Sequence, residues 1–267
     1  MQGHLWDAGA WFDGPVTRTA PATPIGAGAC AVMMGWLTVV LWLDRADGGG
    51  SHPLQRVLGA LTWLLLLVVL GRLAPVVRVQ ALVVVGFATV VEFLASPTLH
   101  VYTYRFHNVP MYVPPGHGLV YLSAFALGHS RYVQRHLRGC TTAALAAGGA
   151  WAAHGLFLAD RQDVLGAFWY ACLVLFVCFG PSKPVYVGAF VVVSYLELVG
   201  TGFGNWVWST HDPTGWVPIG NPPSGAAGGY GWFDLAALLA APYLLRAFSR
   251  RPRDPVTAEP AATVDAR

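Results

Sequence analysis

Charged side chains are scarce in this sequence. Sixteen Lys and Arg and thirteen Asp and Glu make up 11% of its 267 residues, whereas a soluble domain carries about 25%. So few charges could not cover the surface of a water-soluble globule of this size, which excludes an ordinary cytosolic enzyme. The length excludes a small secreted domain stabilised by disulfides. The mean hydropathy of +0.51 indicates instead a multi-pass membrane protein.

Several motifs are also absent. The four cysteines lie in or beside apolar runs without a Cys-x-x-Cys pair, so they predict neither a disulfide framework nor a zinc site. The sixteen basic residues form no stripe with interleaved aromatics, which disfavours nucleic-acid binding. No His-Glu-x-x-His, Gly-x-Ser-x-Gly, Walker or Rossmann fingerprint is present. We therefore expect no bound metal and no cofactor.

The apolar residues fall into eight stretches, each near the ~20 residues that a spanning helix needs. These stretches run over residues 24–43, 57–73, 76–95, 117–133, 140–159, 164–180, 184–203 and 228–246. They lack the strict two-residue alternation of a membrane β-barrel. The expected fold is all-α, a polytopic membrane helix bundle of about eight transmembrane helices. Seven spans is the main alternative, because the shorter runs could lie partly at the membrane interface.

The basic residues predict the orientation of these spans. With eight spans, twelve of the sixteen fall on the side that holds both termini, and four on the other. We therefore expect a cell-membrane protein with both termini in the cytoplasm. Residues 1–23 would be a cytoplasmic segment, which lacks the apolar core of a cleavable signal peptide. Residues 247–267, rich in Pro, Ala and charge, would be a disordered cytoplasmic tail.

Two polar-aromatic segments interrupt the apolar pattern and resemble each other. In each, a glutamate near the end of a span is followed by an aromatic-x-aromatic triplet, a histidine with Asn or Asp, a Pro-Pro pair and a glycine. The first copy contains Glu92, Tyr102, Tyr104, His107, Asn108, Pro114, Pro115 and Gly116; the second contains Glu197, Trp206, Trp208, His211, Asp212, Pro222, Pro223 and Gly225. This order predicts an internal duplication, with residues 24–133 and 140–246 as two parallel four-helix repeats. Aromatics and prolines are also common at membrane interfaces, but that does not explain the matched Glu and His.

The matched glutamates are the strongest candidates for chemistry. Glu92 and Glu197 are the only glutamates besides Glu259. A carboxyl group at the inner edge of a span is costly, and its burial favours the protonated form that a general acid needs. The alternative is a neutral glutamate that only hydrogen-bonds a neighbouring helix.

Other polar and aromatic residues complete the predicted site. His107 and His211 could relay a proton or hold a glutamate in place, and Asp212 and Asp234 are further candidate acids. The side chains expected to contact substrate are Tyr102, Tyr104, Asn108, His117, Trp206, Trp208 and Asn221. Turn formation beside Pro and Gly is the alternative role for the asparagines.

The segment from Glu197 to Trp208 resembles a stretch of the membrane carotenoid hydratases. That family has Glu, then Gly-Thr, then Phe-Gly, then aromatic-x-aromatic at the end of a span; here the segment is shorter, and Trp replaces Tyr. Multi-pass lycopene cyclases and small transmembrane terpene cyclases are similar in size and in their use of buried carboxyl groups. The resemblance covers about thirty residues. It implies an acid role for Glu197 and, by internal symmetry, for Glu92.

These observations predict an integral membrane enzyme that protonates an apolar isoprenoid-type lipid. Cyclisation and hydration both begin with that step. A membrane transporter or lipid carrier is one alternative, because many transporters are built from repeats. A non-catalytic membrane assembly partner, with the aromatic segments as its docking surface, is another.

Overall fold

The structure is a computed structural model that describes residues 26–48 and 50–249. Its helices are α1 (Ala27–Leu43), α2 (His52–Leu70), α3 (Pro75–Ala95), α4 (Val113–Gly128), α5 (Arg131–Arg135), α6 (Leu137–Phe157), α7 (Val164–Phe179), α8 (Lys183–Gly202) and α9 (Ala226–Ser249). The strands are β1 (Tyr102–Tyr104) and β2 (Trp206–Trp208). The predicted cytoplasmic segment 1–23 and residues 250–267 of the predicted disordered tail lie outside the described residues.

The prediction of an α-helical chain is confirmed for the described residues. Each of the eight predicted apolar stretches coincides largely with one of the longer helices, and the short α5 overlaps the end of the predicted stretch 117–133. Local signals fix several helix starts. Ser51 and Asp163 cap α2 and α7 by accepting a backbone N–H with their side chains, and Pro75 begins α3 where its missing N–H costs nothing. The sequence did not predict the two strands, which are each only three residues long.

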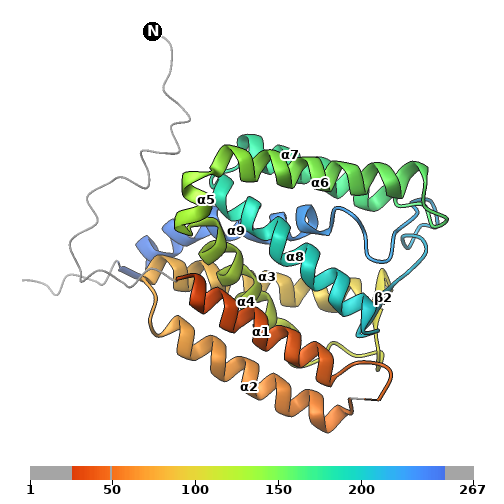
Figure 1. Cartoon of the computed structure of the whole chain (residues 1–267). Coiled ribbons are helices and arrows are strands. Elements are labelled where there is room, and N and C mark those ends of the chain that lie inside the picture. The colour runs from red at the N-terminus through yellow and green to blue at the C-terminus, as the bar shows by residue number, and fades with distance from the viewer. Residues whose placement is uncertain (1–25, 49, 250–267) are drawn as a thin grey trace, which may run out of the picture.

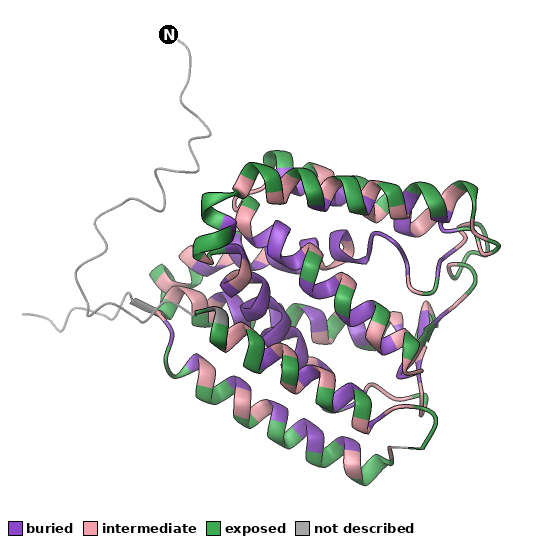
Figure 2. Cartoon of the chain, viewed as in Figure 1, coloured by how far each residue is buried: buried purple, intermediate pink, exposed green. Residues whose placement is uncertain are grey.

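In the described part of the chain, three helices are long and apolar enough to cross a membrane, namely α2, α3 and α8. The helices α1 and α7 are apolar but shorter. Large apolar side chains are exposed on several helices, for example Leu64 on α2, Phe168 on α7 and Phe179 at the end of α7. Figure 2 shows that exposed residues lie along the outer helices of the bundle. Such extensive exposed apolar surface is typical of a protein that contacts lipid.

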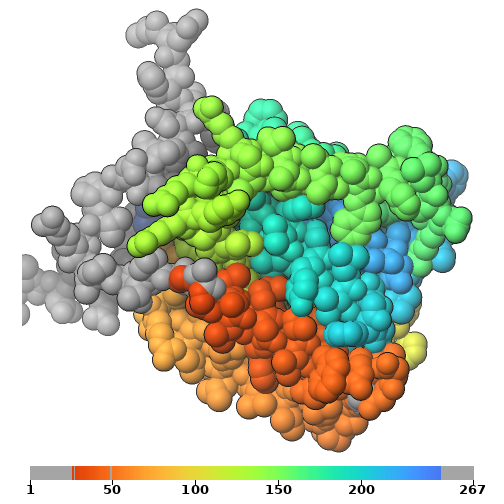
Figure 3. Space-filling model, in the orientation of Figure 1, coloured from red at the N-terminus to blue at the C-terminus, as the bar shows by residue number. Residues whose placement is uncertain are grey.

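The helices form layers around α4. Figure 1 shows α6 and α7 side by side on one flank of the bundle, α1 and α2 on the opposite flank, and α3, α4, α8 and α9 between them. The space-filling view shows one face of the molecule, on which α2, α1, α8 and α6 follow one another (Figure 3). Almost every residue of α4 is buried, because α4 packs against α8, α3, α1 and α2. The strands lie at one end of the bundle, and α5 lies at the other.

The contact between α4 and α8 depends on small residues. A Cβ atom on Gly188 of α8 would lie 2.1 Å from the carbonyl oxygen of Ala124 on α4, and one on Gly128 would lie 2.1 Å from the carbonyl oxygen of Pro184. Both obstacles are backbone atoms, so a side-chain rotation could not relieve the clash. Glycine at these two positions therefore allows the close helix approach that is typical of membrane proteins.

Gly188→Ala is expected to destabilise the bundle. Alanine is more favourable than glycine within a helix by about 1 kcal/mol. The added methyl group would force α4 and α8 apart, however, which should cost about 1–3 kcal/mol. The matched control on the same helix is Gly202→Ala, because a Cβ there meets nothing within 4 Å. In thermal unfolding in one detergent, Gly188→Ala should melt below the wild type and Gly202→Ala at or above it. Equal melting temperatures for the two variants would contradict this packing.

Candidate functional site

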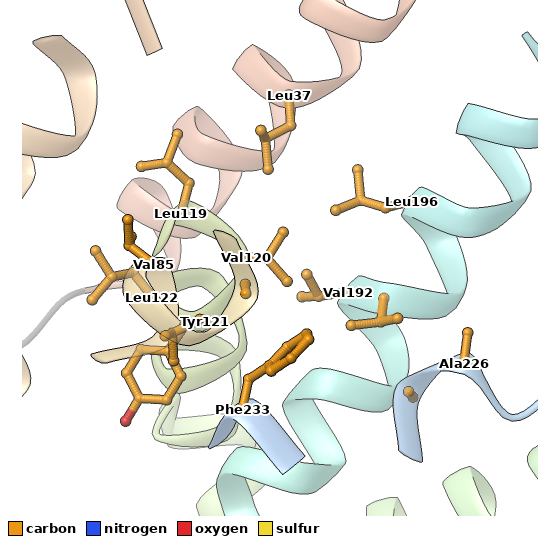
Figure 4. Close-up of a cluster of buried hydrophobic side chains, with 14 of the residues drawn as sticks. Leu37, Val85, Leu119, Val120, Tyr121, Leu122, Val192, Leu196, Ala226 and Phe233 are labelled. Atoms are coloured by element: carbon orange, nitrogen blue, oxygen red, sulfur yellow. The ribbon is translucent and has the colours of Figure 1, made fainter. Parts of the chain in front are cut away.

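One cavity of about 360 Å³ lies between α1, α3, α4, α8 and α9, beside the two strands. Its walls are mostly apolar. Figure 4 shows Leu37 of α1, Val120 of α4, Leu196 of α8 and Phe233 of α9 pointing toward the same space, and all four line the cavity (Figure 4). The polar side chains in its lining are Glu92, Tyr102, Tyr104, Tyr112, His117, Glu197, Trp206, Trp208 and Tyr230, with Trp169 and Trp232 as further indoles.

The strands bring the two aromatic triplets together above this cavity. β1 and β2 pair antiparallel, with Tyr102 opposite Trp208 and Tyr104 opposite Trp206. We call this pair of strands the aromatic sheet. Because side chains alternate along a strand, its four aromatic residues share the face toward the cavity, while Thr103 and Val207 lie on the other face. The rings of Tyr102 and Trp208 are 4.6 Å apart between centroids, and those of Tyr104 and Trp206 are 6.1 Å apart.

Glu92 lies near the end of α3 and is fully engaged by hydrogen-bond donors. The hydroxyl groups of Tyr102 and Tyr104 both donate to its Oε2, each at 2.8 Å. His117 Nε2 on α4 lies 2.8 Å from its Oε1. The His117 ring in turn stacks on Tyr230, with 5.1 Å between centroids, and meets Phe233 edge-on. Two phenol donors and an imidazole nitrogen therefore surround a carboxyl group that is 5% exposed.

Glu197 occupies the matching position on α8, with different partners. The indole N–H groups of Trp206 and Trp208 both donate to its Oε2, each at 3.1 Å. Among the described residues, no hydrogen-bond donor contacts its Oε1. Glu197 is 3% exposed. Each glutamate of the duplicated pattern is thus held by the aromatic triplet that follows it in sequence.

The tyrosines of the aromatic sheet remain donors over the ordinary pH range. Burial raises the pKa of the Tyr102 and Tyr104 hydroxyls well above the usual value for a phenol, and the nearby Glu92 carboxyl group raises the pKa further. Neither phenol ionises near neutral pH, so both can donate a proton to the hydrogen bond with Glu92. Together with the indoles, they supply aromatic faces and donors to one apolar cavity.

The cavity contains part of the predicted site. Of the predicted acids, Glu92 and Glu197 line it, and of the predicted substrate-contacting residues, Tyr102, Tyr104, His117, Trp206 and Trp208 do. The sequence placed His117 among the substrate contacts but did not indicate its hydrogen bond to Glu92. It did not single out Trp169, Tyr230 or Trp232, because lone aromatics in apolar runs give no signal of a site.

The structure places His107, His211 and Asp212 outside the cavity. His107 is exposed, has a positive φ of 54°, and its backbone N–H closes a turn by donating to the Tyr104 carbonyl. His211 is exposed and contacts Thr210. Asp212 accepts hydrogen bonds from the Thr214 hydroxyl and from two backbone N–H groups, which lower its pKa and close a surface turn. The structure therefore does not bring these residues together with the glutamates, and turn formation accounts for Asp212.

Three further predicted residues are near the site without lining it. Asp234 is buried on α9, one turn beyond Tyr230, and its Oδ2 has no hydrogen-bond partner among the described residues. Asn108 donates to Gln55 Oε1 at 3.0 Å. Asn221 accepts the Trp208 backbone N–H at 3.1 Å and so positions β2. Asp234 is the one of these that contributes a buried acid, but that acid lies outside the cavity wall.

Two pairs of residues that the sequence did not single out fasten the loops around the aromatic sheet. Asp163 accepts backbone N–H groups from Gly166, Gly220 and Ser224, at 2.7–2.9 Å. Arg161 donates to three carbonyl oxygens of the segment 208–219. In the other half, Asp44 accepts hydrogen bonds from Gln55 and Tyr112, and Arg105 donates to the carbonyls of residues 44 and 45. The aspartate before α7 has the sequence signal of an N-cap residue; the others have none.

In the part of the chain that the structure describes, no group of three His, Cys, Asp or Glu side chains is arranged to bind a metal ion. No protein-family model matches the chain, and no curated protein and no solved structure matches it. The geometry of the cavity is therefore the basis for a functional conclusion.

Proposed function

We propose that the chain is an integral membrane enzyme that protonates an alkene or epoxide of an isoprenoid-type lipid and so starts its cyclisation or hydration. One observation carries the proposal: Glu92 and Glu197 line the same apolar cavity, and four aromatic side chains of the aromatic sheet line it with them. A buried carboxyl group can serve as a general acid. A hydrocarbon chain fits the remaining, apolar wall.

The aromatic rings suit the intermediate of this reaction. Protonation of an alkene leaves a carbocation, and a cation over the face of an aromatic ring is stabilised by about 0.5–2 kcal/mol. Tyr102, Tyr104, Trp206 and Trp208 are held with their polar groups on the glutamates, which leaves their rings beside the cavity. Whether the cation closes a ring or takes up water depends on how far the site excludes water.

The rim of the cavity favours a substrate that arrives from the bilayer. Phe87 on α3 and Trp232 on α9 both line the cavity and are also 40% and 48% exposed. Val91 and Ala95 on α3 line it as well and are half-buried. The exposed part of the wall is thus apolar, while the carboxyl groups are buried. An isoprenoid lipid could enter sideways between such side chains without crossing water.

We also propose that the eight longer helices all cross the membrane, as two parallel repeats of four. The residue pairs Tyr102 and Trp206, Tyr104 and Trp208, and His107 and His211 are each 104 residues apart. β1 and β2 occupy equivalent positions in the two proposed repeats. They pair antiparallel about their central residues, Thr103 and Val207, as expected for two copies related by a two-fold axis. In the proposed repeat, α3 corresponds to α8 and α4 corresponds to α9. The extensive packing of α3 on α9 and of α8 on α4 agrees with this symmetry.

The backbone supplies a second match between the halves. His100 and Gly204, again 104 residues apart, have φ angles of 52° and 69°. Positive φ is uncommon for a residue other than glycine, so its recurrence at equivalent positions supports the duplication. The start of α1, the end of α9 and the basic helix α5 all lie at the same end of the bundle, which is the end opposite the aromatic sheet. This arrangement supports a cell-membrane protein with both termini in the cytoplasm.

The proposed reaction leaves an isotopic record. Vesicles that contain the full chain would be incubated in D₂O with squalene or lycopene as probes, and the lipids analysed by mass spectrometry. We expect a cyclised or hydrated product with deuterium bound to carbon, because the acid exchanges its proton with solvent. Vesicles with the double variant Glu92→Gln, Glu197→Gln are the control and should yield neither product nor deuterium.

Two outcomes would contradict the proposal. One is a product from the double variant at the wild-type rate. The other is the absence of any deuterated product together with movement of the unchanged lipid between vesicles, which would support a lipid carrier instead.

A further inference from the structure

The hydrogen bonds of the two glutamates are unequal although their positions match. Glu92 makes three hydrogen bonds through both of its oxygens, all at 2.8 Å. Glu197 receives two indole N–H groups at 3.1 Å, both on Oε2. Among the described residues, only Glu92 has a histidine partner, and Oε1 of Glu197 has no donor. This difference, more than the shared burial, separates the roles of the two carboxyl groups.

Hydrogen-bond donors stabilise the ionised form of a carboxyl group, and this stabilisation increases with the number of donors and with shorter distances. The phenol donors at 2.8 Å therefore stabilise negative charge on Glu92 more than the longer indole hydrogen bonds do on Glu197. The two carboxyl groups line one apolar cavity. Two negative charges in such an environment repel each other strongly, so one of the pair keeps its proton. The one with fewer and longer hydrogen bonds is Glu197.

We infer that Glu197 is the proton donor and that Glu92 remains ionised as a fixed counter-charge, which assigns separate roles within the function proposed above. In the first step, the O–H bond at Oε1 of Glu197 breaks and a C–H bond forms on the substrate. The positive charge then lies on the neighbouring carbon, near the Glu92 carboxylate. Loss of a proton from an adjacent carbon, or from an added water molecule, returns the proton to Glu197 and closes the cycle.

Under this assignment His117, Tyr102 and Tyr104 are positioning residues. Their polar groups hold the Glu92 carboxyl group and fix its direction, while the tyrosine rings face the cavity. The stacking of His117 on Tyr230 and its edge contact with Phe233 hold the imidazole in line with Oε1 of Glu92. Because Nε2 must donate to a carboxylate, this geometry also selects the tautomer of His117.

Infrared spectroscopy of glutamate-labelled protein can test the assignment without any substrate. The sequence has only three glutamates, so ¹³C labelling at the side-chain carboxyl carbon of glutamate marks Glu92, Glu197 and Glu259 and leaves Asp234 unlabelled. In wild-type protein in vesicles at neutral pH, we expect one isotope-shifted band of a protonated carboxyl group. Glu197→Gln should remove that band, whereas Glu259→Gln should retain it.

The wild-type spectrum alone can overturn the inference, whatever the variants do. No labelled protonated band would mean that both glutamates are ionised, and two bands would mean that Glu92 is also protonated. Loss of the band in Glu92→Gln but not in Glu197→Gln would reverse the assignment. None of these results bears on whether deuterium enters an isoprenoid product, so the failure of this inference and the failure of the proposed function are distinguishable.

Discussion

Replacing Glu197 by glutamine is expected to lower the turnover of an isoprenoid substrate by roughly 10²–10⁴-fold, the usual contribution of a general acid. The amide keeps the size of the side chain and can still accept the indole N–H groups of Trp206 and Trp208 on its oxygen. It has no acidic proton on the second atom, where the wild-type side chain would donate. The loss should therefore fall on kcat, while KM changes little.

The corresponding substitution at Glu92 should lower turnover less, and for a different reason. Glu92→Gln removes the counter-charge but leaves the proton donor, and loss of one such electrostatic contribution costs roughly 10²–10³-fold. Glu259→Gln is the matched control for a glutamate-to-glutamine change and should leave turnover unaltered. Rates measured for all three variants in the same vesicles, with deuterium content as a second readout, would check the order. Full activity of both Glu92→Gln and Glu197→Gln in folded protein would exclude an acid role.

The helices could be predicted from the sequence because they depend on local composition. A run of apolar residues near the length of a membrane span satisfies its backbone hydrogen bonds internally, whatever it packs against. The pairing of Tyr102 with Trp208 could not be predicted in this way, because it joins residues more than a hundred positions apart. The repeated order of glutamate and aromatic residues in the sequence nevertheless predicted that these two segments are equivalent.

The residues of the candidate site likewise differ in whether the sequence alone could reveal them. Glu92 and Glu197 could be found because glutamate is so rare in this chain that a matched pair stands out. His107 and His211 have the same spacing signal, but the direction of the chain after a short strand depends on backbone angles that spacing does not specify. His107 has a positive φ and is exposed. The contact of His117 with Glu92 spans 25 residues and arises from the packing of α4 on α3.

Asp163→Ala is expected to lower the free energy of unfolding by about 3–5 kcal/mol. The substitution leaves the backbone N–H groups of Gly166, Gly220 and Ser224 without their acceptor, and each unpaired buried donor costs about 1–3 kcal/mol. A Cβ on Gly166 or Gly220 would lie within 3 Å of this carboxyl group, so the segments are packed directly on it and cannot easily form substitute contacts.

The positions of these three backbone donors also predict where local flexibility should increase in Asp163→Ala. Gly166 belongs to the first turn of α7, whereas Gly220 and Ser224 lie in the segment that leads from the aromatic sheet into α9. Loss of Asp163 should therefore detach that segment and speed amide hydrogen exchange there before the bundle unfolds. Asp163→Asn keeps one oxygen acceptor and should lose less stability than alanine. Asp160→Ala, a change at an exposed aspartate three residues away, is the control. If chemical unfolding and hydrogen exchange gave the same result for Asp163→Ala as for Asp160→Ala, Asp163 would not fasten the segment that positions Trp208 over Glu197.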